Sequence, residues 1–401
     1  MKSRITIKYD EIDEFVEKLH SKVMELIHRY FTKEELEQLK QKARELREQI
    51  KHIPSLVIVA RSRTRSARYC INERVVYLRR EFSKFVEEIT VKNTSMSNVW
   101  YRVGLALTDG SVLGPYIRFA STDKELCAIL LKTYPRLYVR LGCIHVLPHE
   151  VKPMLYLRVK DPEVTTIVTC LRRGVVCFPN TYYEVAEFLS GLVDGDGTVN
   201  VRMDKHGWVH CSIYVRCSEH KLRPILQVLE KLKEMKYIDY TLGEIKENWR
   251  PSRYFRIRFS IEHMRKNCLL YLMELRHRRR NAKLRIIKGV GLSRDDLRKL
   301  LQERVRIYLV RRKCGKKYVI VRCVGLGQVE PFKELAVNLL KVPAERVHYY
   351  HSEKYRKYFA EFRASRHHVE WLERLQRLSI VFGLDDLARH VRQAIDFLGR
   401  D

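Results

Sequence analysis

The chain has 401 residues, 45% of them hydrophobic, so it is long enough for two or three units and apolar enough to form packed cores. Its 78 Lys and Arg residues against 48 Asp and Glu residues give a net charge of +30. This composition excludes wholesale disorder and favours a polyanionic partner, nucleic acid above all, over an anionic membrane surface or a merely solubilised one.

No segment predicts a membrane span or an exported protein. The longest apolar runs are too short to cross a bilayer, and the first residues are acidic at Asp10, Glu11 and Asp13 without the apolar run of a signal peptide. The ten cysteines are scattered, and none has the Cys-x2-Cys or Cys-x4-Cys spacing of a zinc site. We therefore expect an intracellular protein, in the cytoplasm or nucleoid, with reduced thiols.

Residues 10–53 predict two helices. Apolar side chains from Ile12 to Ile27 recur at helical spacing, and Thr32 with Glu35 forms a capping-box pattern that starts the second helix. We expect residues 1–95 to form a helical, basic N-terminal extension. Its arginines fit a phosphate-contacting loop and a solvated turn equally well, and they are Arg61, Arg63, Arg65 and Arg68.

The sequence repeats itself between residues 99 and 288. Residues 103–112 and 190–199 each join an apolar, helix-like run to an acid–glycine turn, and each is followed by the same succession of hairpin, helix, hairpin and helix patterns. The sequence therefore predicts an α+β fold with two αββαββα units, residues 96–180 and 181–290, related by a pseudo-twofold axis.

The predicted strands of both units alternate apolar and polar positions. The apolar face would pack on the helices, whereas the polar face is rich in Arg, Lys and Tyr, which suits contacts to phosphates and base edges. The ordinary alternative is a charged, solvated face that resists aggregation. The candidate nucleic-acid-binding residues are Arg118, Tyr156, Arg158, Lys160, Arg202, His210, Tyr214, Arg216, Tyr254, Arg256 and Arg258.

Residues 291–401 predict a C-terminal α/β extension. A strand near 318–321, a helix over 332–340, a hairpin from 347–350 and 359–362, and a helix over 369–378 follow the order of the later elements of each repeat. The acid–glycine turn is missing, so we expect a partial third copy, with a final helix over 384–398. A helix-turn-helix that turns near Pro343 is the competing interpretation.

The two acid–glycine turns carry the predicted chemistry. Small residues such as Gly104 and Gly191 would let the two motif helices pack closely, and then Asp109 and Asp196 would emerge together at the helix ends. Adjacent carboxylates repel each other, so a divalent metal ion is their natural partner. A metal ion beneath a basic groove suits hydrolysis of phosphodiesters.

The second motif resembles a known family signature. It reads Leu189-Ser190-Gly191-Leu192-Val193-Asp194-Gly195-Asp196-Gly197. This stretch is similar to the signature of the LAGLIDADG homing endonucleases and related maturases, and with the diverged partner at residues 102–110 the chain resembles their single-chain, two-motif members. The resemblance implies Mg²⁺ or Mn²⁺ at Asp109-Gly110 and Asp196-Gly197. It also implies a monomer that lays two saddle-shaped sheets on double-stranded DNA and cleaves a specific site.

Two features depart from the family pattern. Leu107 stands where the second motif has Asp194, and Arg102 occupies a normally apolar position, whereas Glu187 on the second motif helix is expected to be exposed. The family also tends to place a basic residue, often lysine, near the end of each repeat. The candidates for this catalytic role are Arg278, Arg280 and Lys160.

Arginine stays protonated, so it is a poor base although it can stabilise a transition state. This weakness and the departure at Leu107 keep an alternative open, in which a non-catalytic relative binds intron RNA as a maturase or acts as a DNA-binding regulator. A basic protein without sequence preference is the third hypothesis.

Overall fold

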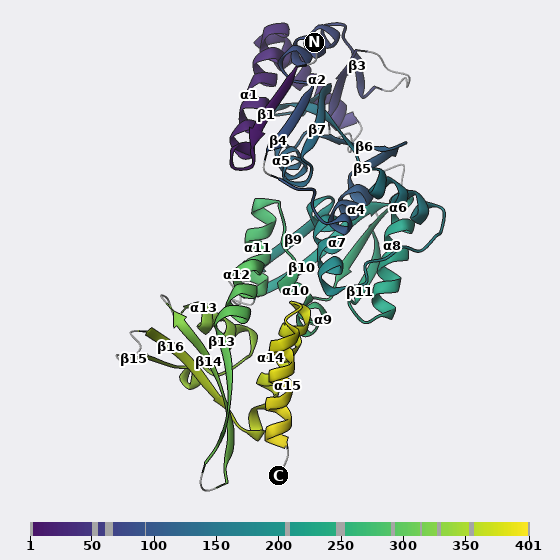
Figure 1. Ribbon diagram of the computed structural model, residues 1–401. Helices are drawn as coiled ribbons and strands as arrows, with labels where there is room; N and C mark the ends of the chain where they lie inside the picture. The colour runs from purple at the N-terminus through teal and green to yellow at the C-terminus, as the bar shows by residue number, and fades with distance from the viewer. Residues whose placement is uncertain are drawn as a thin grey trace.

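The computed structural model describes residues 3–49, 55–60, 67–92, 94–204, 209–245, 253–289, 293–312, 315–326, 330–352 and 357–399. Arg61, Arg63 and Arg65 lie outside these ranges. The fold is mixed α+β, and three sheets follow one another along the chain (Figure 1). Within the described ranges, none of the helices has both the length and the apolar character needed to span a bilayer.

The first sheet has eight strands and contains the first predicted repeat. Residues 99–172 run α4 (Val99–Thr108), β5 (Gly110–Leu113), β6 (Tyr116–Ser121), α5 (Lys124–Thr133), β7 (Arg136–Val146), β8 (Val151–Lys160) and α6 (Pro162–Arg172). The strand order is β1-β4-β7-β8-β6-β5, and β2 and β3 add to the free edge of β7. The order of helices and strands in residues 99–172 is therefore αββαββα.

The prediction of a helical extension over residues 1–95 is only partly right. Three helices are present, α1 (Ile12–Tyr30), α2 (Lys33–Gln49) and α3 (Arg74–Phe85), and the Thr32–Glu35 capping box starts α2 as expected. The same segment also supplies four strands, β1 (Arg4–Lys8), β2 (Leu56–Val59), β3 (Tyr69–Ile71) and β4 (Glu88–Lys92).

These strands join the first sheet because β7 is long. It has 11 residues, so one of its edges pairs with β8 while the other accepts β4 near one end and β2 near the other. Strands of three to five residues carry little periodic signal, and their partners lie far along the chain, so local patterns do not reveal them.

The second unit has its own four-stranded sheet. It runs α7 (Tyr182–Asp194), β9 (Gly197–Met203), β10 (Val209–Ser218), α8 (Glu219–Glu234), β11 (Tyr240–Ile245), β12 (Tyr254–Phe259) and α9 (Ile261–Lys266), followed by α10 (Leu269–Leu272) and α11 (Arg278–Lys288). Its strand order, β11-β12-β10-β9, matches β7-β8-β6-β5 of the first sheet.

The C-terminal segment is a more complete third unit than the sequence predicts. It contains α12 (Arg294–Lys299) and a π-helical turn (Leu300–Arg304), then β13 (Val305–Arg311) and β14 (Lys317–Leu326), α13 (Glu330–Lys333) and a second π-helical stretch (Glu334–Leu339), β15 (His348–Ser352), β16 (Lys357–Ala364), α14 (Val369–Val381) and α15 (Asp385–Gly399). The strand order is β13-β14-β16-β15. The sequence patterns miss the helix α12 and the first strand, β13.

All three sheets share one register. The row that starts at the first residue of the first strand is Gly110, Phe119, Leu157 and Val139 in the first sheet, Gly197, Val215, Ile257 and Leu242 in the second, and Val305, Cys323, Ala360 and Tyr349 in the third. The helix-turn-helix alternative is wrong, because a short 3-10 turn (Ala344–Arg346) and the strand β15 follow Pro343.

Candidate active site

The helices α4 and α7 pack against each other through two glycines. A Cβ atom on Gly104 would lie 2.4 Å from the carbonyl oxygen of Phe188, and one on Gly191 would lie 2.1 Å from that of Tyr101. Both distances are shorter than real Cβ contacts, so only glycine allows the two backbones to approach this closely. This close packing brings the carboxyl ends of the two motif helices together.

The strand that follows each helix folds directly back on it. A Cβ atom on Gly110 would lie 2.7 Å from the carbonyl oxygen of Ala106, and one on Gly197 would lie 2.3 Å from the Cα of Val193. Both glycines therefore have a structural role in the helix-to-strand turn. Their proposed part in the metal sites stays a prediction.

Asp109 and Asp196 meet where the two helices end. A Cβ atom added to Gly195 would lie 3.2 Å from Oδ2 of Asp109, which shows how close the first aspartate comes to the second motif. Burial and the neighbouring charge of Asp196 raise the pKa of Asp109 to about 7. Burial raises the pKa of Asp196 as well, against the opposing charges of Lys221 and Arg280, so the pair retains a proton that an exposed aspartate would lose.

This carboxylate pair fits a hard cation. Replacing the retained proton by a divalent ion relieves the repulsion between two ionised aspartates, and Mg²⁺ is commonly held by one or two carboxylates plus substrate phosphates. In the part of the chain that the structure describes, no three His, Cys, Asp or Glu side chains gather as a metal cluster. The pair alone is the candidate for metal binding.

Lys221 is a site residue that sequence reasoning misses. It lies near the start of α8, with its Nζ 3.5 Å from Oδ2 of Asp196, and it donates a hydrogen bond to the carbonyl oxygen of Thr108. It thus bridges the two units at the aspartate pair. The alignment of the two repeats does not predict this role, because the residue that corresponds to Lys221 in the first repeat is Glu125.

The three predicted basic catalytic residues have different positions. Arg280 is at the centre, but its Nη1 donates to the carbonyl oxygens of Val193, Asp194 and Gly195 at 2.6, 2.7 and 3.0 Å and so caps the end of α7. Its charge lowers the pKa of both aspartates, after the larger effects of burial and nearby charge. Arg280 therefore stabilises the carboxyl end of α7 and lowers the pKa of Asp109 and Asp196.

Arg278 and Lys160 lie elsewhere. Arg278 is exposed at the start of α11 and lines a cavity with residues of α1 and α5, and Lys160 is exposed at the end of β8. In the described ranges, no contact between either side chain and Asp109 or Asp196 is present. The structure thus does not bring these two predicted residues to the carboxylates.

Asp194, the other acid of the second motif, forms buried hydrogen bonds that connect α7 to α4 and to the segment before α11. It is buried and accepts hydrogen bonds from the Tyr101 hydroxyl at 2.8 Å and from the backbone N–H groups of Arg276 and His277 at 2.6 and 3.2 Å. Burial raises its pKa to about 6. Leu107, at the matching place in the first motif, is buried without such a role, so this departure leaves the aspartate pair intact.

Arg102 and Glu187, two charged residues of the motif helices, form ion pairs with residues of other elements. The Arg102 side chain, 5% exposed, pairs with the buried Asp161 and with Glu163. The expectation that Glu187 is exposed is wrong, because it is 5% exposed and forms a 2.6 Å ion pair with Arg294. Both partners are distant in sequence, which is why spacing within the motif does not identify them.

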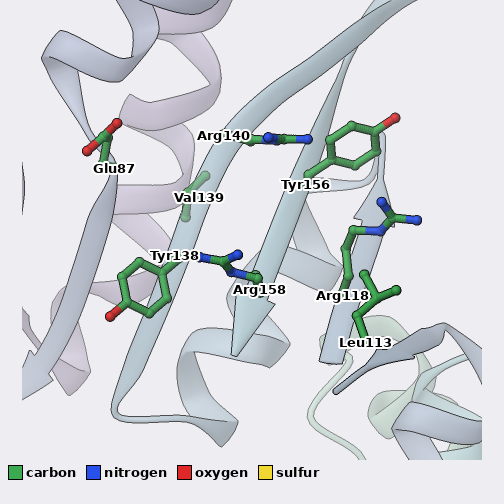
Figure 2. A pocket seen from close by; sticks show the side chains of 8 residues that line it. All are labelled: Glu87, Leu113, Arg118, Tyr138, Val139, Arg140, Tyr156 and Arg158. Carbon is green, nitrogen blue, oxygen red and sulfur yellow. The ribbon is translucent and has the colours of Figure 1, made fainter. Parts of the chain in front are cut away.

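The polar face of the first sheet carries the predicted basic and aromatic side chains. Arg118 and Arg140 lie over the Tyr156 ring at 5.6 and 5.5 Å, and Arg158 lies 4.6 Å from the centre of the Tyr116 ring. A cavity of about 290 Å³ opens on this face (Figure 2). Its lining residues are Glu87, Leu113, Arg118, Tyr138, Val139, Arg140, Tyr156 and Arg158.

The second sheet repeats this arrangement. Register pairs Arg216 with Arg256 and Tyr214 with Arg258, so all of these side chains share one face, and Arg256 lies 5.1 Å from the centre of the Tyr214 ring. The same face bears Arg202, His210 and Tyr254. His210 is tied to Asp204 at 2.9 Å. Cation–π packing holds the arginines extended without neutralising them.

Comparison with solved structures finds meganucleases at low similarity. The LAGLIDADG meganuclease I-AabMI bound to uncleaved DNA aligns at 12% identity over 55% of this chain and 98% of its own, with a TM-score of 0.18. The meganuclease I-SmaMI bound to uncleavable DNA gives 14% identity over 56% and 97%, with a TM-score of 0.16, and I-CpaMI gives 6% over 55% and 98%, with a TM-score of 0.16. No family profile and no curated protein matches the chain.

Proposed function

We propose that the chain is a site-specific endonuclease that hydrolyses phosphodiester bonds of double-stranded DNA with Mg²⁺ or Mn²⁺. The observation that carries this proposal is the meeting of Asp109 and Asp196 at the glycine-packed ends of α4 and α7. Each carboxylate comes from a different unit, so one centre lies on the pseudo-twofold axis that the two units would share.

The flanking sheets support a duplex as the substrate. Exposed arginines on the polar faces of both sheets, with Arg158 and Arg256 as examples, suit the regularly spaced phosphates of DNA, and contacts of this kind supply most of the binding free energy. We propose that the duplex lies along both faces as on a saddle. The scissile phosphates would then lie next to the aspartate pair.

Asp109 and Asp196 would hold the metal ion, which when bound supplies Lewis-acid stabilisation of the phosphate and a more acidic water molecule. The chain's own residues do the rest. Lys221, 3.5 Å from Asp196, supplies a cationic donor at the centre, and Arg280 fixes the turn that carries Asp196. We propose Lys221 as the basic residue that the arginine candidates could not supply.

The third sheet extends the same architecture without the acid. The residue directly before the first strand is Asp109 in the first unit, Asp196 in the second and Arg304 in the third. We therefore propose a single catalytic centre. The RNA-maturase alternative rests on Leu107 and on the absence of a suitable lysine. Lys221 weakens the second argument, and intron RNA enters the test as a comparison.

A randomised duplex library tests the proposal. Wild-type protein is incubated with the library in Mg²⁺, in Mn²⁺ and in EDTA, and cut ends are recovered by sequencing. We expect one family of related sites cut only with metal. Binding of duplex without any cutting, or preference for the host-intron transcript over duplex, would count against the nuclease.

A further inference from the structure

A second feature, away from the aspartate pair, is a basic cavity between the second and third units. It has a volume of about 370 Å³ and lies where α9 and α10 approach α14 (Figure 1). Five cationic residues line it, namely Arg265, Lys266, Lys341, Arg374 and Arg377. Glu262 is the acid in its lining.

The charge in this cavity is unbalanced. Glu262 pairs with Lys266 at 2.8 Å and its side chain is 77% exposed, so it does not neutralise the other cations. Within the described ranges, none of Arg265, Arg374 and Arg377 has an ion pair with an acid. Arg265 and Arg374 instead donate to backbone carbonyls, of Ile287 and Leu340 respectively, each at 3.0 Å.

These carbonyl contacts orient the guanidinium groups but leave their positive charge. Lys341 completes the cluster, and its pKa is lowered by burial and then by the charges of Arg265 and Arg374, so the three cations lie close together. Burial raises the pKa of the Cys268 thiol in the same cavity, and the positive charge of Arg377 opposes this shift. The positive charges that line this cavity repel one another unless an anion lies between them.

The backbone around the cavity is also strained. Cys268 and Lys341 have φ angles of 61° and 63°, and together with Lys236 they are the non-glycine residues with positive φ in the described chain. Such conformations are unfavourable for residues other than glycine and gather at ligand sites, where surrounding structure holds them in place. Both residues line the same cavity.

We propose that this cavity binds a phosphate group. Two guanidinium groups fixed by carbonyls, a third free guanidinium and an ammonium present the donor forks and the charge that a phosphate oxyanion requires. The phosphate belongs either to the backbone of a bound nucleic acid or to a small free phosphate compound. The site is separate from Asp109 and Asp196 and does not depend on the nuclease proposal.

Arg377 and Lys341 give the sharpest variants, because neither is shown in a hydrogen bond that holds the described fold together. We compare full-length wild type with Arg377→Gln and Lys341→Asn, since asparagine tolerates positive φ. The control is Arg298→Gln, an exposed arginine of α12 outside the cavity lining. The probe is inorganic phosphate at constant ionic strength, followed by calorimetric titration and thermal unfolding.

The expected result is that phosphate raises the unfolding temperature of wild type and control, and that its affinity falls about tenfold or more in both cavity variants. In phosphate-free buffer the variants should unfold at the same or a higher temperature, because they remove a repulsive charge. Phosphate that binds all four proteins equally, or none, overturns the proposal.

Duplex binding then distinguishes the two sources of phosphate. If Arg377→Gln and Lys341→Asn weaken duplex affinity and inorganic phosphate competes with the duplex, the ligand is a backbone phosphate. If both variants lose inorganic phosphate but bind duplex as wild type does, the ligand is a small phosphate compound. Either result supports the site.

Discussion

At the scale of single residues, the two aspartates of the proposed centre retain a proton that an exposed pair would lose. Burial and the charge of Asp196 raise the pKa of Asp109 to about 7, whereas an aspartate in the unfolded chain titrates near 3.8. Between these values the folded state holds a proton that the unfolded state has lost.

The sign of the pH effect follows directly. As pH rises from about 4 to about 7, the metal-free protein should lose free energy of unfolding relative to Asp109→Asn, because ionising Asp109 places two charges together. Urea denaturation at a series of pH values measures the difference. Adding Mg²⁺ above pH 7 should restore stability to wild type but not to the variant, and equal pH profiles for the two proteins would contradict a retained proton.

Lys221 provides a second test at this scale. Lys221→Met should lower the cleavage rate by about 10²–10³ with little change in duplex affinity, because it removes one positive donor beside Asp196. Lys231→Met, at a half-exposed lysine further along α8 that pairs with Glu234, is the matched control. Cleavage and binding are measured on the same target. If Lys221→Met lowers duplex affinity but not the cleavage rate of bound duplex, Lys221 contacts phosphate and does not take part in cleavage.

The residues that sequence reasoning found and missed differ in one physical respect. Asp109 and Asp196 were predicted because each follows an apolar helix in a local motif. Lys221 and the Arg102–Asp161 pair act through partners in other elements, at separations that no local spacing encodes.

At the scale of elements, the contact of α4 with α7 decides whether the centre forms. Gly191→Ala places a methyl group 2.1 Å from the Tyr101 carbonyl, so the helices must separate. We expect a loss of about 1–3 kcal/mol or more in chemical denaturation, together with weaker cleavage. Gly243→Ala is the control, because a Cβ there meets no atom within 4 Å. Equal stability of the two variants would contradict the close packing.

The buried Arg102–Asp161 pair gives a further prediction for this helix. Arg102→Met leaves the Asp161 carboxylate, with 1% of its side chain exposed, without its main cation and should cost about 3–5 kcal/mol. Arg4→Met is the comparison, since its buried partner Glu88 keeps Arg136. Urea unfolding measures both variants. A fall in the free energy of unfolding of less than about 1 kcal/mol for Arg102→Met would show that the ion pair contributes little to stability.

At the scale of the whole molecule, three units with one strand order and one register follow each other along the chain. The two motif-bearing units could be predicted because their repeats carry a local acid–glycine signal. The third unit was seen only in part, because its first strand follows a π-helical turn and lacks that signal. The strands of residues 1–95 were missed because their pairing is decided by the free edge of β7.

Salt dependence tests the basic faces as one surface. If duplex DNA lies along both sheets, Arg158→Ala and Arg256→Ala should each lower the slope of log affinity against log salt by about one. Arg389→Ala, an exposed arginine paired with Asp386 on α15, should leave the slope unchanged. Fluorescence anisotropy over a salt series measures all three slopes. Unchanged slopes in both sheet variants would show that the duplex does not contact these faces.

Cleavage of a selected target by single aspartate variants in Mg²⁺ tests the proposed aspartate centre most directly. Because Asp109 and Asp196 are proposed to share one centre, Asp109→Asn and Asp196→Asn should each lose cutting of both strands by about 10²-fold or more while binding the duplex as wild type does. Asp239→Asn, at a half-exposed aspartate of the second unit that pairs with Lys233, should cut normally. Cutting of both strands at the wild-type rate by either centre variant would contradict the account.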